Sequence, residues 1–110
     1  MSSAHRTNDD VWLVVPLFNE ETVIADVVRD ARKTFPNIVV VDDGSSDHGA
    51  DAAASAGAMV VRHPVNLGQG AALQTGLEYA LGVPTMRWVV TFDSDGQHQV
   101  SDVLAMLDKA

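Results

Sequence analysis

Four short apolar runs, separated by segments long enough for helices, limit what this chain can fold into. The runs are VWLVV at 11–15, IVVV at 38–41, AMVV at 58–61 and WVVTF at 88–92. They are continuous rather than alternating and rich in β-branched residues, which is typical of strands buried on both faces of a sheet. Because helix-length segments join them, we predict an α/β fold: a Rossmann-like, mostly parallel sheet flanked by helices.

The segments between the runs have helical patterns. The predicted helices occupy residues 20–35, 46–57, 68–82 and 101 onward. Asn19 is the expected N-cap of the first helix, and Pro36 stops it. In the third helix Leu73, Leu77 and Leu81 recur at i, i+4 and i+8, a spacing typical of a helix.

The organisation of the chain indicates one domain. No repeat, linker or low-complexity run divides it, so we expect one domain over residues 11–110 after a flexible N-terminus at 1–10. No apolar run approaches the ~20 residues that span a bilayer, and the start lacks the layout of a signal peptide. We therefore expect a cytoplasmic protein.

Charge and cysteine content narrow the class of partner. The formal net charge is −8, from 15 acidic and 7 basic residues, which argues against a nucleic-acid partner. With no cysteine, a metal would be held by oxygen or imidazole ligands. An acidic protein can still bind a phosphorylated small molecule when a divalent cation changes the local charge.

Polar clusters follow three of the four predicted strands. These clusters read PLFNEE at 16–21, DDGSSD at 42–47 and DSDGQH at 93–98. Each has an ordinary explanation as a helix start or a turn. Ligands of parallel sheets bind beyond the carboxyl ends of the strands, and three acidic clusters at one edge would repel one another. Together the clusters therefore favour a site with a bound cation.

Asp93 and Asp95 are the strongest metal candidates. In extended chain, residues i and i+2 point to the same side, so both carboxylates can face one ion. Mg²⁺ and Mn²⁺ favour such oxygen ligands beside water and substrate phosphates. Gln97 could add an amide oxygen, whereas His98 is more often an ordinary surface histidine.

The glycine-bearing run NLGQGAALQTG at 66–76 allows two interpretations. Gly68 and Gly70 could present N–H groups to a phosphate at a helix start, or the run could serve packing, with Gly76 close to the sheet. No P-loop pattern and no GxGxxG after the first strand is present. Arg62 and His63, at the end of the third strand, are possible anion contacts or simply an exposed pair.

Taken together, VPLFNEE, VVVDDGSSD, NLGQGAALQTG and FDSDGQH resemble the donor-binding half of family 2 glycosyltransferases. The likeness is closest to the polyprenyl-phosphate sugar transferases, such as the dolichyl-phosphate mannosyltransferase type. It covers nearly the whole chain from Val11, in the family's order. The resemblance implies a GT-A fold, a GDP- or UDP-linked sugar donor, a Mg²⁺ or Mn²⁺ ion, and inverting transfer to a polyprenyl phosphate or similar acceptor.

The resemblance also implies roles for individual residues. The expected contacts to the donor nucleotide come from Pro16, Phe18, Glu20, Asp43 and Asp93. Of these, Asp43 would hold the base or ribose region. The expected metal ligands are Asp93, Asp95 and Gln97, which occupy the family's DxD position and the residue two places after it.

Two departures from the family bear on activity. Many relatives carry a basic residue where Gln69 stands, so a charged phosphate contact is missing or comes from elsewhere. The family's domain continues into an acceptor-binding half, and nothing of that half follows Ala110. We therefore expect an N-terminal part of a larger transferase, inactive alone and with its catalytic residues unknown, whose full-length form lies in the cytoplasm or at the inner membrane face.

Two other classes of function stay open. The chain could be a nucleotide-binding or self-associating module without turnover, and an uncovered sheet edge would favour a homo-oligomer in either case. A receiver-like signalling domain is the third alternative. That class expects an acidic pair after the first strand, whereas Asp42 and Asp43 follow the second.

Overall fold

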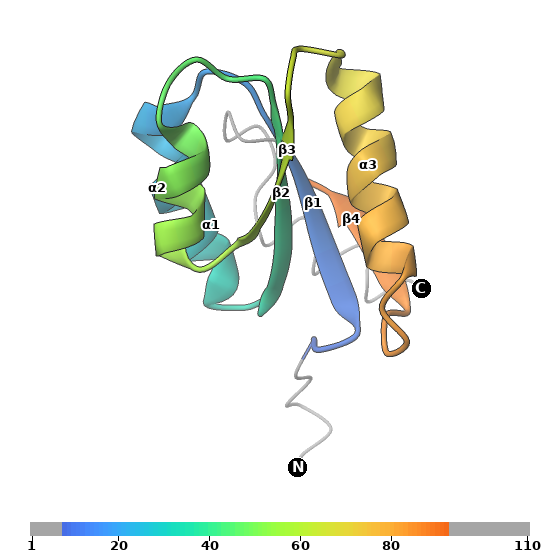
Figure 1. Ribbon diagram of the computed structural model, residues 1–110. Coiled ribbons are helices and arrows are strands. Elements are labelled where there is room, and N and C mark those ends of the chain that lie inside the picture. The colour runs from blue at the N-terminus through green and yellow to red at the C-terminus, as the bar shows by residue number, and fades with distance from the viewer. Residues whose placement is uncertain (1–7, 93–110) are drawn as a thin grey trace.

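A parallel sheet lies between two layers of helices in the computed structural model, which describes residues 8–92 (Figure 1). The strands are β1 (Val11–Leu17), β2 (Asn37–Asp43), β3 (Met59–His63) and β4 (Trp88–Thr91). The helices are α1 (Glu21–Arg32), α2 (Gly49–Ala56) and α3 (Gln69–Leu81). The strand order is β3-β2-β1-β4 with every pairing parallel, which confirms the predicted α/β fold. The fourth predicted helix lies outside the described residues.

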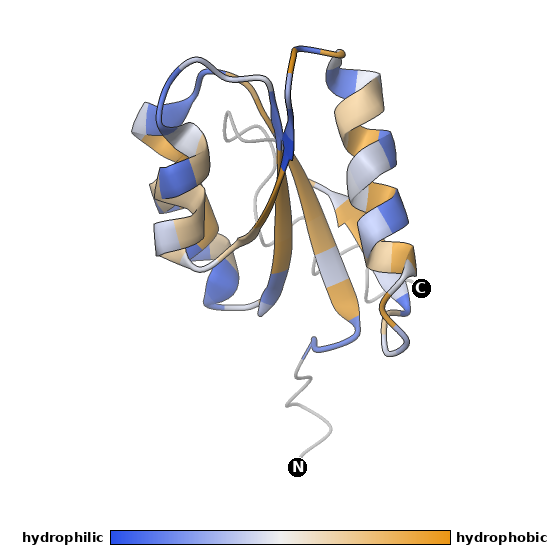
Figure 2. Ribbon diagram, in the orientation of Figure 1, coloured by the Kyte–Doolittle hydropathy of each residue, from blue (hydrophilic) through white to orange (hydrophobic). Residues whose placement is uncertain are grey.

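The central strand β1 divides the apolar core in two. Leu13 and Val15 belong to the cluster beneath α1 and α2, whereas Trp12 and Val14 belong to the cluster beneath α3. Both faces are therefore buried, which explains why the run is continuously apolar (Figure 2). Fully burying a side chain of this size contributes about 1.5–3 kcal/mol, so β1 is a large source of stability.

The start of α1 differs from the prediction. The helix buries Ile24, Val28 and Ala31, as its pattern indicates, but it begins at Glu21, and Asn19 is not its N-cap. Asn19 has a positive φ of 52°, and its side chain accepts a hydrogen bond of 2.9 Å from the N–H of Ser46. Asn19 therefore joins the loop after β1 to the loop after β2.

One carboxylate caps two helices. Asp47 accepts the N–H of Glu21 at 3.2 Å and the N–H of Gly49 at 3.0 Å, so it binds the first residue of both α1 and α2. The second helix begins at Gly49, three residues later than predicted, and ends at the left-handed Gly57. Asp47 thus fixes the two helices of one layer relative to each other.

The buried face of α3 consists of small residues. The helix buries Ala72, Gly76 and Ala80, whereas Leu81 is exposed. A Cβ atom at position 76 would collide with the side chain of Val14, so the small residues let α3 lie directly on β1. The packing role proposed for Gly76 is confirmed.

The described fold begins before the predicted boundary. Asn8 is buried, and its side-chain amide donates a hydrogen bond of 2.9 Å to the carbonyl of Thr34. The carbonyl of Asp9 accepts a hydrogen bond of 2.7 Å from the side chain of Asn37. Residues 8–10 therefore belong to the domain rather than to the flexible terminus predicted for 1–10, the rest of which lies outside the described residues.

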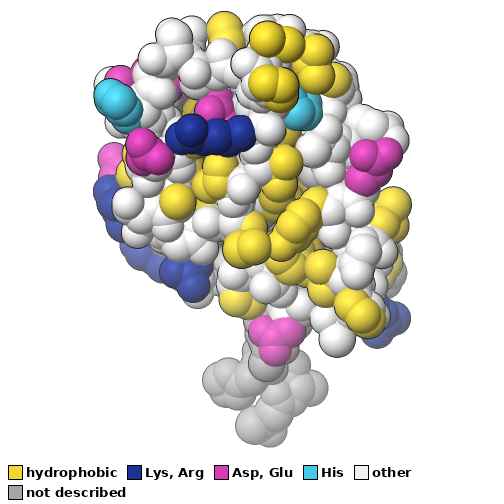
Figure 3. All heavy atoms as spheres, in the orientation of Figure 1, with side chains coloured by type: hydrophobic (Ala, Val, Ile, Leu, Met, Phe, Trp, Pro, Cys, Tyr) yellow, Lys and Arg dark blue, Asp and Glu magenta, His cyan; other side chains and the backbone are white. Residues whose placement is uncertain are grey.

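Strand β3 is an edge of the sheet within residues 8–92, with a neighbour only on the β2 side. Its first residue, Met59, is 51% exposed. On the side of the molecule drawn in Figure 3, hydrophobic side chains gather between the two helical layers. An edge strand of this kind can pair with another chain.

Candidate functional site

A cavity of about 300 Å³ opens where the carboxyl end of β1 meets the start of α3. Four of the predicted nucleotide contacts line it: Pro16, Phe18, Glu20 and Asp43. The opposite wall comes from Asn66, Gly68, Gln69 and Ala72. The structure thus brings these four predicted residues together at one site. The other predicted site residues, Asp93, Asp95 and Gln97, lie outside the described residues.

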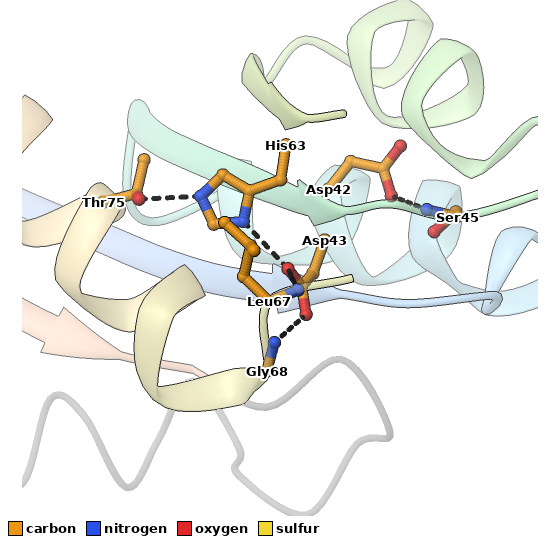
Figure 4. A network of polar contacts seen from close by, with 7 residues as sticks. All are labelled: Asp42, Asp43, Ser45, His63, Leu67, Gly68 and Thr75. Atoms are coloured by element: carbon orange, nitrogen blue, oxygen red, sulfur yellow. Dashed lines mark hydrogen bonds and ion pairs between the residues drawn. The ribbon is translucent and has the colours of Figure 1, made fainter. Parts of the chain in front are cut away.

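Asp43, the last residue of β2, is the most deeply buried of the four predicted contacts. Only 3% of it is exposed. Its Oδ1 accepts hydrogen bonds from the His63 ring at 2.8 Å and the Leu67 N–H at 2.9 Å (Figure 4). Its Oδ2 accepts the N–H of Gly68 at 2.9 Å. Since an ionised carboxylate has about four acceptor positions, one position on Oδ2 lacks a partner among residues 8–92.

The surroundings of Asp43 keep it ionised. Burial alone would raise the pKa of the Asp43 carboxyl, because it disfavours the charged form. The hydrogen bonds from His63, Leu67 and Gly68, together with the charge of His63, outweigh burial and lower this pKa. Asp43 is therefore a preformed anionic acceptor at the cavity wall.

His63 is not the exposed strand-end residue of the default interpretation. Its side chain is only 10% exposed and lies between Asp43 and Thr75 of α3 (Figure 4). Its Nδ1 donates to Asp43, because an ionised carboxylate can only accept. Its Nε2 lies 2.8 Å from the Thr75 hydroxyl, which donates to a neutral ring and accepts from a charged one. The chain Asp43–His63–Thr75 therefore links β2, β3 and α3.

In the cluster DDGSSD, the carboxylates of Asp42 and Asp47 form hydrogen bonds to nearby backbone N–H groups. Asp42 accepts the N–H of Ser45 at 3.1 Å and closes the turn after β2. Asp47 caps two helices, as described above. These engaged carboxylates do not fit the receiver-like alternative, which needs an acidic pair available to a ligand. No group of three or more acidic or histidine side chains suited to a metal occurs within residues 8–92.

Gly44 after β2 and Gly68 after β3 take part in loop contacts within the protein. The N–H of Gly68 is used by Asp43, so it is not a free donor for a ligand. At Gly44 a Cβ would collide with the backbone of Val65 and Asn66, and its φ is +76°. Loop 64–68 therefore packs backbone to backbone on the end of β2. This contact forms the corner of the cavity.

Sequence analysis missed the pairing of His63 with Thr75. The residues lie twelve positions apart in different elements, and neither is marked by a local pattern. Only a partial signal was present in the sequence: His63 comes shortly before the glycine-bearing run 66–76, and Thr75 lies within it. Arg62, the other candidate anion contact, instead forms an ion pair of 3.2 Å with Asp51.

No helix within residues 8–92 has the length and apolar character of a membrane span.

Comparisons with known proteins agree on one family. The model of the family described as "Glycosyl transferase family 2" matches residues 12–110. Glycosyltransferase AglJ of Haloferax volcanii is 37% identical over 103 residues, which cover 93% of this chain and 33% of that protein. UDP-N-acetylglucosamine–dolichyl-phosphate N-acetylglucosaminyltransferase of Methanococcus voltae is 31% identical over 117 residues, covering 88% and 45%.

Solved structures give the same result. Glucosyl-3-phosphoglycerate synthase from Mycobacterium tuberculosis, solved in complex with Mn²⁺, UDP-glucose and phosphoglyceric acid, superposes with a TM-score of 0.64 at 30% identity. The match covers 78% of this chain and 33% of that one. The chain therefore spans well under half the length of these matched proteins.

Proposed function

Since the chain belongs to glycosyl transferase family 2, we propose that its cavity binds the nucleotide of a sugar donor. The whole protein then transfers the sugar to a polyprenyl phosphate or similar acceptor. One observation carries the proposal: Pro16, Phe18, Glu20 and Asp43 line one cavity at the carboxyl ends of the parallel strands. Such an edge is where ligands of open α/β sheets bind.

The base is the part of the donor that the described residues can recognise. The remaining acceptor position of Asp43 suits an imino N–H, which uracil carries at N3 and guanine at N1. Cytosine has a lone pair at N3 and would face the carboxylate with like polarity. UDP occurs in the names of two matched proteins, which supports a UDP-linked donor over a GDP-linked one.

The sugar diphosphate requires positive charge that the cavity wall does not supply. We assign Mg²⁺ or Mn²⁺ to Asp93, Asp95 and Gln97, which follow β4 directly in the chain. Their carboxylate and amide oxygens are the donor types that these ions prefer. When bound, the ion offsets the charge that develops on the leaving nucleoside diphosphate.

The acceptor is proposed from the chemistry of transfer. An acceptor phosphate oxygen attacks the anomeric carbon as the bond to the nucleoside diphosphate breaks, and attack from the opposite side inverts the configuration. A phosphate oxygen is already anionic, so this acceptor class needs little help from a base. A lipid acceptor would place the whole protein at the cytoplasmic face of a membrane.

Calorimetry with UDP, GDP and CDP, each with and without Mn²⁺, tests the donor site. We expect UDP to bind the folded chain, more tightly with Mn²⁺ and at least about tenfold more tightly than CDP, as one hydrogen bond to a charged group implies. GDP tighter than UDP would change the base assigned. If no nucleotide binds a demonstrably folded sample with or without Mn²⁺, the proposed donor site is wrong. Binding without turnover of UDP-sugars would identify this chain as a binding part alone.

A further inference from the structure

We propose that His63 is a positioning residue of the nucleotide site, which makes the cavity select a base carrying an imino N–H by fixing the Asp43 carboxylate. Thr75 supports this role by holding the far side of the ring. The inference rests on the proposed nucleotide binding, and it assigns a role to two residues that do not line the cavity.

The first argument is the direction of the Asp43 carboxylate. Two donors, His63 and Leu67, hold Oδ1, and only Gly68 holds Oδ2. The single open acceptor position therefore belongs to Oδ2, and its direction depends on how Oδ1 is held. Without the His63 donor, each oxygen keeps only one N–H partner, so the carboxylate is held less firmly about its terminal torsion. A second acceptor position would also open on Oδ1, and the site would no longer present one acceptor in one direction.

The second argument is the link to α3. The Thr75 hydroxyl lies 2.8 Å from His63 Nε2, so the imidazole is held at both nitrogens. Thr75 lies on the same helix as Gln69 and Ala72, which line the cavity. A shift of α3 would therefore change the ring and the carboxylate together. Such outer partners that fix a ring's tautomer and orientation strongly affect the group they serve.

The third argument is the cost of placing this polar chain inside the protein. The side chains of His63 and Asp43 are only 10% and 5% exposed. Two apolar side chains in their place would avoid the cost of removing polar groups from water. A tie between β2 and loop 64–68 already exists through Gly44 and the two N–H groups that Asp43 accepts. The contacts of His63 with Asp43 and Thr75 therefore add little to the connection between β2 and the loop. What they do is fix the orientation of a charged group beside a cavity.

The test compares UDP and CDP affinities, because their ratio reports the imino contact and is insensitive to general loosening. His63→Leu removes both ring nitrogens, His63→Asn keeps a donor near the Nδ1 position, and Thr75→Val removes the hydroxyl at constant shape. We expect the UDP preference to fall about tenfold in His63→Leu, and only several-fold in Thr75→Val and His63→Asn, which both lose the Thr75 contact but keep a donor to Asp43. His48→Leu is the matched control, since the His48 side chain is 85% exposed at the start of α2 and does not line the cavity.

The outcomes separate the two proposals. If the wild-type chain binds UDP and His63→Leu keeps the full preference over CDP, this inference is overturned while the donor site stands. If the wild type binds no nucleotide, the donor site itself is wrong. Should His63→Leu fail to fold, Thr75→Val decides alone: a preference equal to that of the wild type overturns the inference, and a reduced one supports it. An equal loss in His48→Leu would also overturn it.

Discussion

At the scale of single residues, the Asp43 carboxylate joins three segments that are far apart in the chain. It accepts from His63 on β3 and from two N–H groups of the loop that leads into α3, while its own backbone ends β2. Desolvation of a buried carboxylate is costly, and these three donors are what offset it. One buried charge therefore both shapes the cavity corner and presents an acceptor there.

The lowered pKa of Asp43 predicts a specific acid dependence of stability. A folded-state pKa below the unfolded value of about 3.9 means that the group stabilises the fold fully above about pH 4. This share is lost as the pH falls through the folded-state value. We expect Asp43→Asn to lower the unfolding free energy by roughly 1–3 kcal/mol at pH 7 and by progressively less below pH 4. Urea denaturation from pH 2.5 to 7 measures this difference.

The control for this prediction is Asp30→Asn, at an exposed carboxylate on α1. It should stay close to the wild type at pH 7, since surface ion pairs contribute about 0–1 kcal/mol. A constant difference between wild type and Asp43→Asn across the whole pH range would contradict the assigned role of the charge.

The residues of the site could be predicted only where local patterns marked them. Pro16 and Asp43 lie at the ends of β1 and β2, and Phe18 and Glu20 follow β1. The topology rule for parallel sheets brings these strand ends together. His63 could be placed at the end of β3 but not oriented, because its partners come from elements twelve and twenty positions away. Side-chain pairing at that range depends on the packing of whole elements, which periodicity does not encode.

At the scale of elements, α3 shows what an apolar pattern leaves open. The leucines at i, i+4 and i+8 mark the helix, but the small residues Ala72, Gly76 and Ala80 occupy its buried face. Close approach to β1 favours small side chains there, and the larger ones at Leu73 and Leu77 flank the contact. The second strand is also longer than its apolar run predicted, because Asp42 and Asp43 lie within β2 despite their charge. Hydrogen bonding of their carboxylates, which a hydropathy pattern omits, allows that burial.

Two glycines of α3 provide a matched test of this packing. Gly76→Ala places a methyl group against Val14, so we expect a loss of roughly 1–3 kcal/mol in unfolding free energy from overpacking. Gly70→Ala meets nothing within 4 Å and should gain up to about 1 kcal/mol from higher helix propensity. Urea denaturation of both variants gives the comparison. Equal effects of the same sign would show that α3 does not rest on β1 through Gly76.

At the scale of the whole molecule, the exposed edge of the sheet bears on assembly. Within residues 8–92, β3 pairs only with β2, and its other side presents unpaired backbone groups together with the half-exposed Met59. Unpaired strand edges are templates for pairing with another chain, and edge lysines are a common means of preventing it. The oligomer stays a prediction from the sequence, and we propose β3 as its surface.

Light scattering across a concentration series tests this surface. We expect the chain to form a dimer or larger oligomer, and Met59→Lys to shift it towards the monomer, because a charge at the edge must lose its hydration when a second strand pairs there. Met59→Gln is the matched control: it keeps the length of the side chain without the charge and should weaken association less. The Met59 side chain is half exposed, so neither change should unfold the domain. If the wild type stays monomeric at high concentration, or if Met59→Lys associates as strongly as the wild type, β3 is not the assembly surface.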